Sequence, residues 1–331
     1  MDQVIRWGIL GTGRIARAFA TALRDIPGAE LVAVASRSSA SAEEFGREFE
    51  VKRCHASYQA LADDAQVDIV YIATPHTLHA DNALMCLHAG KHILCEKAFT
   101  MNQREAAQVI ALARQKKLFL MEAMWTRFLP AIVEAKRLIT SGAIGKVQQV
   151  QADLGFVATV GLEHRLLNPE LGGGAVLDLG SYPLSTSTFF LGPVDVVQAI
   201  GEFSATGIDM QTAFVLRHRD GGVSSCMCSL RTKTPSEMTI SGELGSIRLH
   251  ARFHQTETLT LMLANGDTRT LHCPFIGNGY AYEAIEVMRC LRAGLTESPV
   301  MPLDETLALM GVLDTIRAQI GLSYGADLAS I

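Results

Sequence analysis

The chain has 331 residues, which predicts two domains because a single hydrophobic core rarely grows that large. Apolar residues make up 48% and charged residues 19%, a composition typical of a well-buried globular protein. The formal net charge is −5 with no run of Lys or Arg, which argues against nucleic acid as a partner.

No signal peptide is visible and the apolar stretches are too short to cross a bilayer, so we expect a cytoplasmic protein with no membrane partner.

The seven cysteines are scattered and form no CxxC pair, and no histidine spacing is typical of zinc. This pattern predicts free thiols in a reducing cytosol and no metal site.

The first third of the chain alternates short apolar runs with helical patterns. Strands are predicted at residues 7–10, 31–35, 67–73, 92–95 and 118–121, and helices at 14–23, 40–49, 80–89 and 103–115. This alternation implies right-handed crossovers and a doubly wound parallel sheet.

The pattern changes after Gly145. Strands are predicted at residues 147–156, 209–218, 223–230, 238–240, 246–250, 259–263 and 268–272, mostly joined by glycine-containing turns, with helices at 280–292 and 303–320. Hairpins in series predict an antiparallel sheet. We therefore predict an α/β protein with a Rossmann domain over residues 1–122. An α+β domain with a large, mostly antiparallel sheet follows over 123–331, and its final helices can pack back on the first domain.

A glycine fingerprint, G-x-G-x-x-A, follows the first predicted strand and opens the first helix. Gly11 permits the tight turn, Gly13 lets the backbone approach a diphosphate, and Ala16 allows close packing of helix on strand. The diphosphate would lie on the helix N-terminus, where free N–H groups favour anions. The residues predicted to bind the dinucleotide here are Gly8, Gly11, Thr12, Gly13, Arg14 and Ile15.

The end of the second strand distinguishes NAD from NADP. NAD enzymes place an acid there for the ribose 2′-hydroxyl, but this chain has Ser36 and Arg37 and no carboxylate before Glu43. A guanidinium binds a 2′-phosphate with two parallel hydrogen bonds, so NADP is favoured over NAD.

Two further strand ends carry polar residues. Ligands of open α/β sheets bind outside the carboxyl ends of the strands, so these residues are predicted to line the cofactor site. They are Thr74, Pro75, His76 and His79 after the strand at 67–73, and Glu96 and Lys97 after the strand at 92–95.

Together these motifs resemble the Gfo/Idh/MocA family of oxidoreductases. The resemblance covers nearly the whole chain and includes residues 172–182, which read Gly-Gly-Gly-Ala-Val-Leu-Asp-Leu-Gly-Ser-Tyr. Residues 122–130 and Tyr182 resemble the branch of dimeric dihydrodiol and D-xylose dehydrogenases. The resemblance implies a dehydrogenase or reductase acting on CH–OH groups, and a homodimer formed through the second domain's sheet.

The resemblance assigns catalytic roles to Lys97, Asp178 and Tyr182. Oxidation of an alcohol removes a hydride and a proton, and a nearby ammonium favours the phenolate form of a tyrosine. Lys97 would supply that charge, Tyr182 would be the base, and Asp178 would orient the substrate or hold Lys97. One departure is Ala98, where the family usually has proline.

Further predictions concern residues that could face the substrate, because aromatic rings stack on sugars or arene diols and arginine binds hydroxyls. They are Trp125, Arg127, Phe156 and Arg165.

The leading hypothesis is hydride transfer between NADP(H) and a sugar, a polyol or a cyclic trans-diol. Two alternatives stay open: an NAD-dependent inositol-type dehydrogenase, and a non-catalytic regulator that senses the dinucleotide. The sequence does not identify the substrate, because fold does not determine function.

Overall fold

The computed structural model describes residues 3–328 and divides into two compact units. The first unit comprises Met1–Trp125 with Ile276–Leu307, and the second comprises Thr126–Phe275 with Ala308–Ile331. No helix within the described residues is long and apolar enough to cross a membrane.

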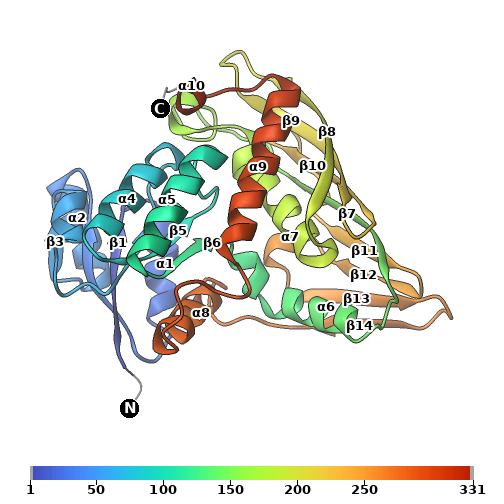
Figure 1. The fold of residues 1–331 in the computed structure, drawn as a ribbon, viewed down its shortest axis with the longest axis horizontal. Coiled ribbons are helices and arrows are strands. Elements are labelled where there is room, and N and C mark those ends of the chain that lie inside the picture. The colour runs from blue at the N-terminus through green and yellow to red at the C-terminus, as the bar shows by residue number, and fades with distance from the viewer. Residues whose placement is uncertain (1–2, 329–331) are drawn as a thin grey trace. The chain divides into compact units, whose positions relative to one another are not determined.

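The first unit contains a six-stranded sheet in the order β3-β2-β1-β4-β5-β6, and every neighbouring pair is parallel. The strands are β1 (Ile5–Leu10), β2 (Ala29–Ala35), β3 (Arg53–His55), β4 (Ile69–Ile72), β5 (His92–Glu96) and β6 (Leu120–Ala123). The helices are α1 (Arg14–Leu23), α2 (Ser39–Phe49), α3 (Tyr58–Ala62), α4 (His79–His88), α5 (Gln103–Lys116) and α8 (Ala281–Arg292) (Figure 1). This confirms the predicted Rossmann sheet, whose order reverses between β1 and β4.

Aromatic rings from β1, α1 and β4 form the centre of this unit's core. Phe19 stacks on Tyr71 with centroids 3.8 Å apart, and Trp7 meets Phe19 edge-on at 5.3 Å. The short elements β3 and α3 were not predicted, because three and five residues are too few to show a period.

Helix α8 contacts α1 although more than 250 residues separate them in the chain. The side-chain amide of Asn278 donates to the carbonyl of Ala18 at 2.8 Å, and the backbone N–H of Leu120 donates to the carbonyl of Thr296 at 3.1 Å. The segment around α8 therefore completes the first unit.

The second unit contains an eight-stranded sheet in the order β14-β13-β12-β11-β7-β10-β9-β8. Its strands are β7 (Val147–Gly155), β8 (Val194–Phe203), β9 (Asp209–His218), β10 (Val223–Ser229), β11 (Met238–Gly242), β12 (Gly245–Leu249), β13 (Thr258–Leu263) and β14 (Thr268–His272). All neighbouring pairs are antiparallel except β7 and β10, which are parallel. The mostly antiparallel prediction is confirmed, but β8 and the parallel pair were missed.

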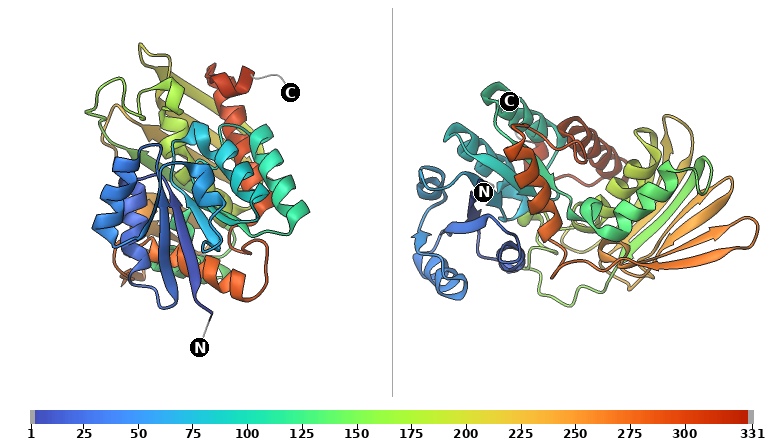
Figure 2. Two further views of the ribbon diagram at one scale, coloured as in Figure 1. Left: turned by 90° about the vertical axis from the view of Figure 1, so that its left-hand side faces the viewer. Right: turned by 90° about the horizontal axis from the view of Figure 1, so that it is seen from below.

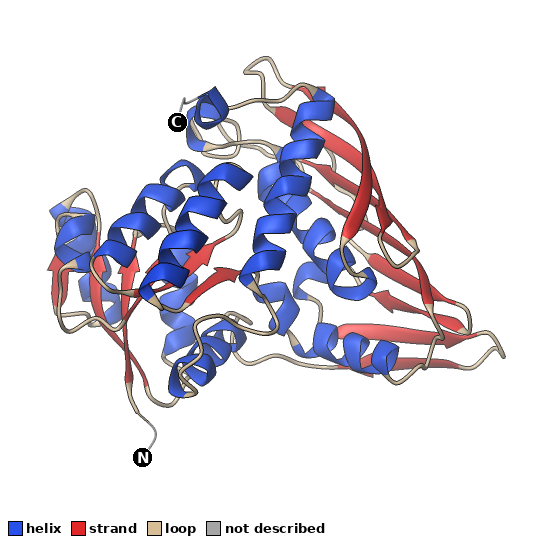
Figure 3. Ribbon diagram, in the orientation of Figure 1, coloured by secondary structure: helices blue, strands red, loops and turns tan. Residues whose placement is uncertain are grey.

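Among the described residues, the helices of the second unit cover one face of this sheet and leave the other bare (Figures 2 and 3). Helix α6 (Pro130–Thr140) contacts β12 and β13, and α7 (Ser181–Leu191) contacts β7. The remaining helices are α9 (Leu303–Ile320), which spans both units, and α10 (Gly325–Leu328). The bare face of the sheet is the surface expected for self-association.

Candidate functional site

The predicted dinucleotide turn lies at the carboxyl end of β1, next to the reversal point of the sheet. Gly11 has φ +101°, and a Cβ there would lie 2.8 Å from the carbonyl oxygen of Ala73, so only glycine fits. Gly13 is the N-cap of α1, and no side-chain hydrogen bond caps this helix in the part of the chain that the structure describes. A Cβ on Gly13 would meet nothing within 4 Å. The exposed N-terminus of α1 therefore faces open space, which fits a diphosphate.

Arg17, which was not predicted, supports this turn from inside α1. Its guanidinium donates to the carbonyl of Thr12 and, at 2.8 Å, to the carboxylate of Glu48 on α2. Arg14 begins the helix and is exposed, and Ile15 is half-buried.

Gly8 was also predicted to bind the cofactor, and the structure shows what surrounds it. It lies inside β1, where a Cβ would be 3.0 Å from both Leu61 and Val67. Its missing side chain makes room for core residues, so it has a packing role.

The end of β2 presents Arg37 to solvent beside Tyr58. Burial raises the pKa of Tyr58, and the charge and hydrogen bond of Arg37 oppose that shift. The hydroxyl of Ser38 accepts from the backbone N–H of Ser41 at 3.4 Å and so caps α2. The hydroxyl of Ser36 likewise accepts from the backbone N–H of Ser38 at 3.4 Å. Ser36 and Arg37 stay the predicted contacts of a ribose or a 2′-phosphate.

His79, predicted to bind the cofactor, instead bridges two strand ends. Its Nε2 lies 2.8 Å from the carbonyl oxygen of Thr74, and its Nδ1 lies 2.9 Å from that of Ala98. The ring is fully buried, and burial lowers its pKa. Because both ring nitrogens face backbone carbonyls, these contacts give His79 a role in holding the two segments together. Pro75 precedes a short 3-10 turn whose first residue, His76, is also buried and meets His79 edge-on.

Glu96 is the last residue of β5 and Lys97 follows it, in a buried environment that contains a second acid, Glu283. Glu96 accepts hydrogen bonds from the hydroxyl of Tyr71 and, at 3.2 Å, from the backbone N–H of Lys97. Burial and the charge of Glu96 raise the pKa of Glu283 on α8 well above its usual range. Lys97 is 9% exposed, and the Lys97–Ala98 peptide bond is cis. Glu96 therefore holds the backbone that carries Lys97.

Asp178 and Tyr182 lie close together in the second unit. Asp178 belongs to a π-helical turn, Val176–Gly180, that continues into α7, and Tyr182 is the second residue of α7. One oxygen of Asp178 accepts from the guanidinium of Arg165 at 2.9 Å, and Arg165 is about half exposed. The Tyr182 ring packs on His254 with centroids 5.0 Å apart. His254, in a short 3-10 turn, had no signal in the sequence.

Arg127, which was predicted to face a substrate, packs inside the second unit. It is fully buried, donates to Ser185 at 2.9 Å and to Thr188 at 3.1 Å, and lies over the Phe189 ring. These contacts attach the turn before α6 to α7.

The other aromatic predictions differ in exposure. Trp125 is buried and stacks on Tyr280 with centroids 4.3 Å apart. Phe156 is 39% exposed at the end of β7, where its backbone N–H donates to Ser229. Phe156 and Arg165 therefore remain as candidates to contact a substrate.

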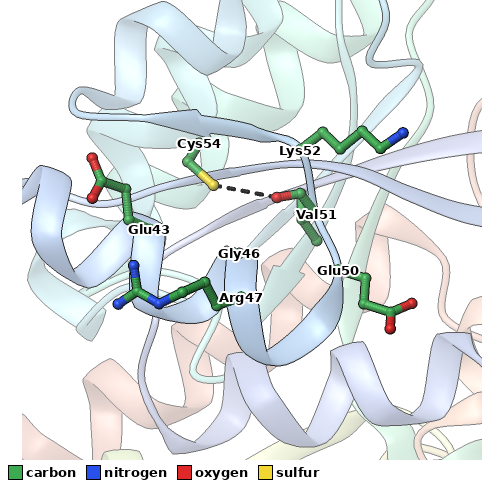
Figure 4. A pocket seen from close by; sticks show the side chains of 7 residues that line it. All are labelled: Glu43, Gly46, Arg47, Glu50, Val51, Lys52 and Cys54. Carbon is green, nitrogen blue, oxygen red and sulfur yellow. Dashed lines mark hydrogen bonds between the residues drawn. The ribbon is translucent and has the colours of Figure 1, made fainter.

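An open pocket at the edge of the first unit contains none of the predicted site residues. Figure 4 shows it between α2 and β3, where the Cys54 thiol donates to the carbonyl of Val51 at 3.4 Å. Its lining residues are Glu43, Gly46, Arg47, Glu50, Val51, Lys52 and Cys54.

Comparison with known proteins supports the resemblance seen in the sequence. Residues 5–124 match the model of an oxidoreductase family with an NAD-binding Rossmann fold, GFO_IDH_MocA, and residues 132–248 match the GFO/IDH/MocA C-terminal domain. The chain is 35% identical to the trans-1,2-dihydrobenzene-1,2-diol dehydrogenase of Mus musculus, over 98% of this chain and 99% of that protein. It is 37% identical to the D-xylose 1-dehydrogenase (NADP(+)) of Hypocrea jecorina, over 97% and 93%.

The fold also matches solved structures. The aldose-aldose oxidoreductase from Caulobacter crescentus superimposes with a TM-score of 0.88 at 23% identity, over 96% of this chain and 97% of that chain.

Proposed function

Because the chain belongs to the Gfo/Idh/MocA family of NAD(P)-dependent oxidoreductases, we propose that it transfers a hydride between NADP(H) and a sugar, a polyol or a cyclic trans-diol. The observation that carries the proposal is the uncapped N-terminus of α1 above Gly13, at the reversal point of the sheet. The cofactor would bind at this turn, where NADP⁺ would supply the carbon that accepts a hydride and NADPH the carbon that donates one. The chain's own residues must then orient the substrate and move one proton.

Tyr182 is the proposed proton carrier, and Lys97 supplies the positive charge that favours its phenolate. Asp178 forms an ion pair with Arg165 and lies one helical turn before Tyr182. The pair offers a substrate one hydrogen-bond acceptor and several donors. Such a pair suits a substrate with neighbouring hydroxyl groups. Phe156 adds an exposed aromatic face, which suits the apolar face of a sugar ring or a cyclic diol.

A substrate screen tests this proposal. Reduction of NADP⁺ and, separately, of NAD⁺ is measured with pentoses, hexoses, inositols and trans-dihydrodiols. Turnover with at least one of the sugars or dihydrodiols is the expected result. Turnover only of inositols with NAD⁺ favours the inositol-type alternative. Tight dinucleotide binding without turnover of any substrate favours the regulator.

The preference for NADP predicts the effect of Arg37→Ala. Removing the guanidinium is expected to raise KM for NADP by about 10–150-fold, since hydrogen bonds to charged groups contribute about 1.5–3 kcal/mol. KM for NAD should change little, because NAD has no 2′-phosphate. Steady-state kinetics with both cofactors measure this. Equal increases in the two KM values would show that Arg37 does not recognise the phosphate.

The bare sheet face predicts a homodimer. It carries Val196, Ile200, Val215 and Val223 from β8, β9 and β10, and Ile200 is 74% exposed. Exposed apolar groups of this kind mark interaction surfaces, and two-fold dimers are the commonest oligomers. Light scattering should give about twice the 35.8 kDa chain mass. Ile200→Lys should shift that mass towards the monomer, whereas a wild-type monomer at micromolar concentration would contradict the prediction.

A further inference from the structure

Asp209 is a buried carboxylate on the strand beneath the glycine-rich turn. It is the first residue of β9 and is fully buried. One of its oxygens accepts from the backbone N–H of Val176 at 2.8 Å and from the hydroxyl of Thr212 at 2.9 Å. Val176 is the first residue of the π-helical turn that contains Asp178. A side chain from β9 therefore caps the helix that carries the proposed catalytic pair.

The same turn is held from a second side by the C-terminal segment. The hydroxyl of Tyr324 donates to the carbonyl of Gly173 at 2.5 Å. Gly174 has φ +131°, and a Cβ there would lie 2.3 Å from the other oxygen of Asp209. The absence of a side chain at Gly174 is thus what lets the carboxylate approach the turn.

This arrangement carries a cost to stability. Burial raises the pKa of Asp209 to about 6, although the hydrogen bonds from Thr212 and Val176 oppose the shift. The oxygen beside Gly174 has no hydrogen-bond partner among the described residues. Because the pKa is above that of an unfolded aspartate, the ionised group disfavours the fold increasingly as pH rises from about 4 through 6. An asparagine at this position could accept the hydrogen bond from Val176 without the destabilisation caused by a buried charge. A contribution to stability therefore does not explain why an aspartate occupies position 209.

We propose that Asp209 is a positioning residue: its carboxylate anchors the N-terminus of the turn that carries Asp178 and Tyr182, and so sets their place for proton transfer. The ionised form is the better acceptor for the N–H of Val176, because charge-assisted hydrogen bonds are the stronger ones. The negative charge of the carboxylate also interacts favourably with the partial positive charge at the helix N-terminus. The proposal rests on the proposed function only for its effect on rate.

The experiment compares Asp209→Ala and Asp209→Asn with Asp195→Ala, a matched change at an exposed ion pair with Arg217 on the same sheet. Asp209→Ala is expected to lower kcat about 10²-fold, since misplacement by about 1 Å can cost that much. The Kd for NADP should stay within about twofold, because the cofactor turn lies in the first unit. Asp209→Asn keeps an acceptor but not the charge, so it should recover only part of the rate above pH 6, and Asp195→Ala should leave kcat unchanged.

Two readouts separate positioning from a general structural role. Amide hydrogen exchange in Asp209→Ala should rise in residues 172–182 and not across the rest of the second unit. The pH profile of kcat should show a step near pH 6 in the wild type that is missing in Asp209→Asn, which folds without a buried charge. The other titratable groups that face Asp209 are Tyr324 and Cys228, and both are unchanged in this variant.

A folded Asp209→Ala with normal kcat and normal exchange would overturn the proposal. Increased exchange across the whole second unit would also overturn it, as would an unchanged pH profile in Asp209→Asn. If the wild type turns over none of the screened substrates, the proposed function fails. Exchange in residues 172–182 still decides whether Asp209 anchors the turn.

Discussion

Tyr182→Phe is expected to lower kcat by about 10²–10⁴-fold, or roughly 3–5 kcal/mol of barrier, the usual contribution of a general acid or base. The substitution keeps the ring and its packing on His254 and removes only the hydroxyl oxygen. Binding of NADP, measured by fluorescence titration, should stay within about twofold, because the variant changes only the proton carrier.

The control for this variant is Tyr282→Phe, which removes a hydroxyl from α8 in the first unit. Its kcat should match the wild type. A Tyr182 with only a structural role would give a lower melting temperature with near-normal kcat in the folded protein. That result would transfer the base role to Lys97, since both ring nitrogens of His79 face backbone carbonyls.

Lys97→Met is expected to lower kcat by about 10²-fold or more, because it removes the charge that favours the phenolate while keeping a long side chain. Steady-state kinetics measure the loss, and Lys116→Met on the exposed part of α5 is the control. A normal rate in folded Lys97→Met would show that the ammonium has no part in proton transfer.

The double variant tests whether the two residues act together. If Lys97 and Tyr182 form one catalytic unit, the double variant should be little slower than the slower single variant. Multiplied losses would show that they contribute independently.

Local sequence patterns alone predicted much of the fold. The helices α1 and α9 and the strands β9 and β14 have the bounds that periodicity predicts. The glycine turn was also predictable from the G-x-G-x-x-A fingerprint. Glycine is required there because the backbone at Gly11 leaves no space for a side chain. In each case the signal lies within a few adjacent residues, where period, turn chemistry and length agree.

Tertiary structure decided the elements whose sequences do not favour their conformation. Helix α7 is rich in Ser and Thr and contains Pro183, so its own propensity does not predict a helix. Nearly all of its residues are buried, and that packing stabilises it. The parallel pairing of β7 with β10 was not predictable either. The two strands are more than 60 residues apart, and neither strand's sequence indicates its partner.

The candidate site shows the same division. Resemblance indicated Asp178 and Tyr182, but the structure alone joined Asp178 to Arg165 across 13 residues and Val176 to Asp209 across 33. It also showed the packing contacts of Gly8, His79 and Arg127, which the sequence did not indicate. These contacts depend on which groups the folded chain brings within about 3 Å of each other, the range of a hydrogen bond. Sequence periodicity indicates helices and strands but not which distant residues come into contact.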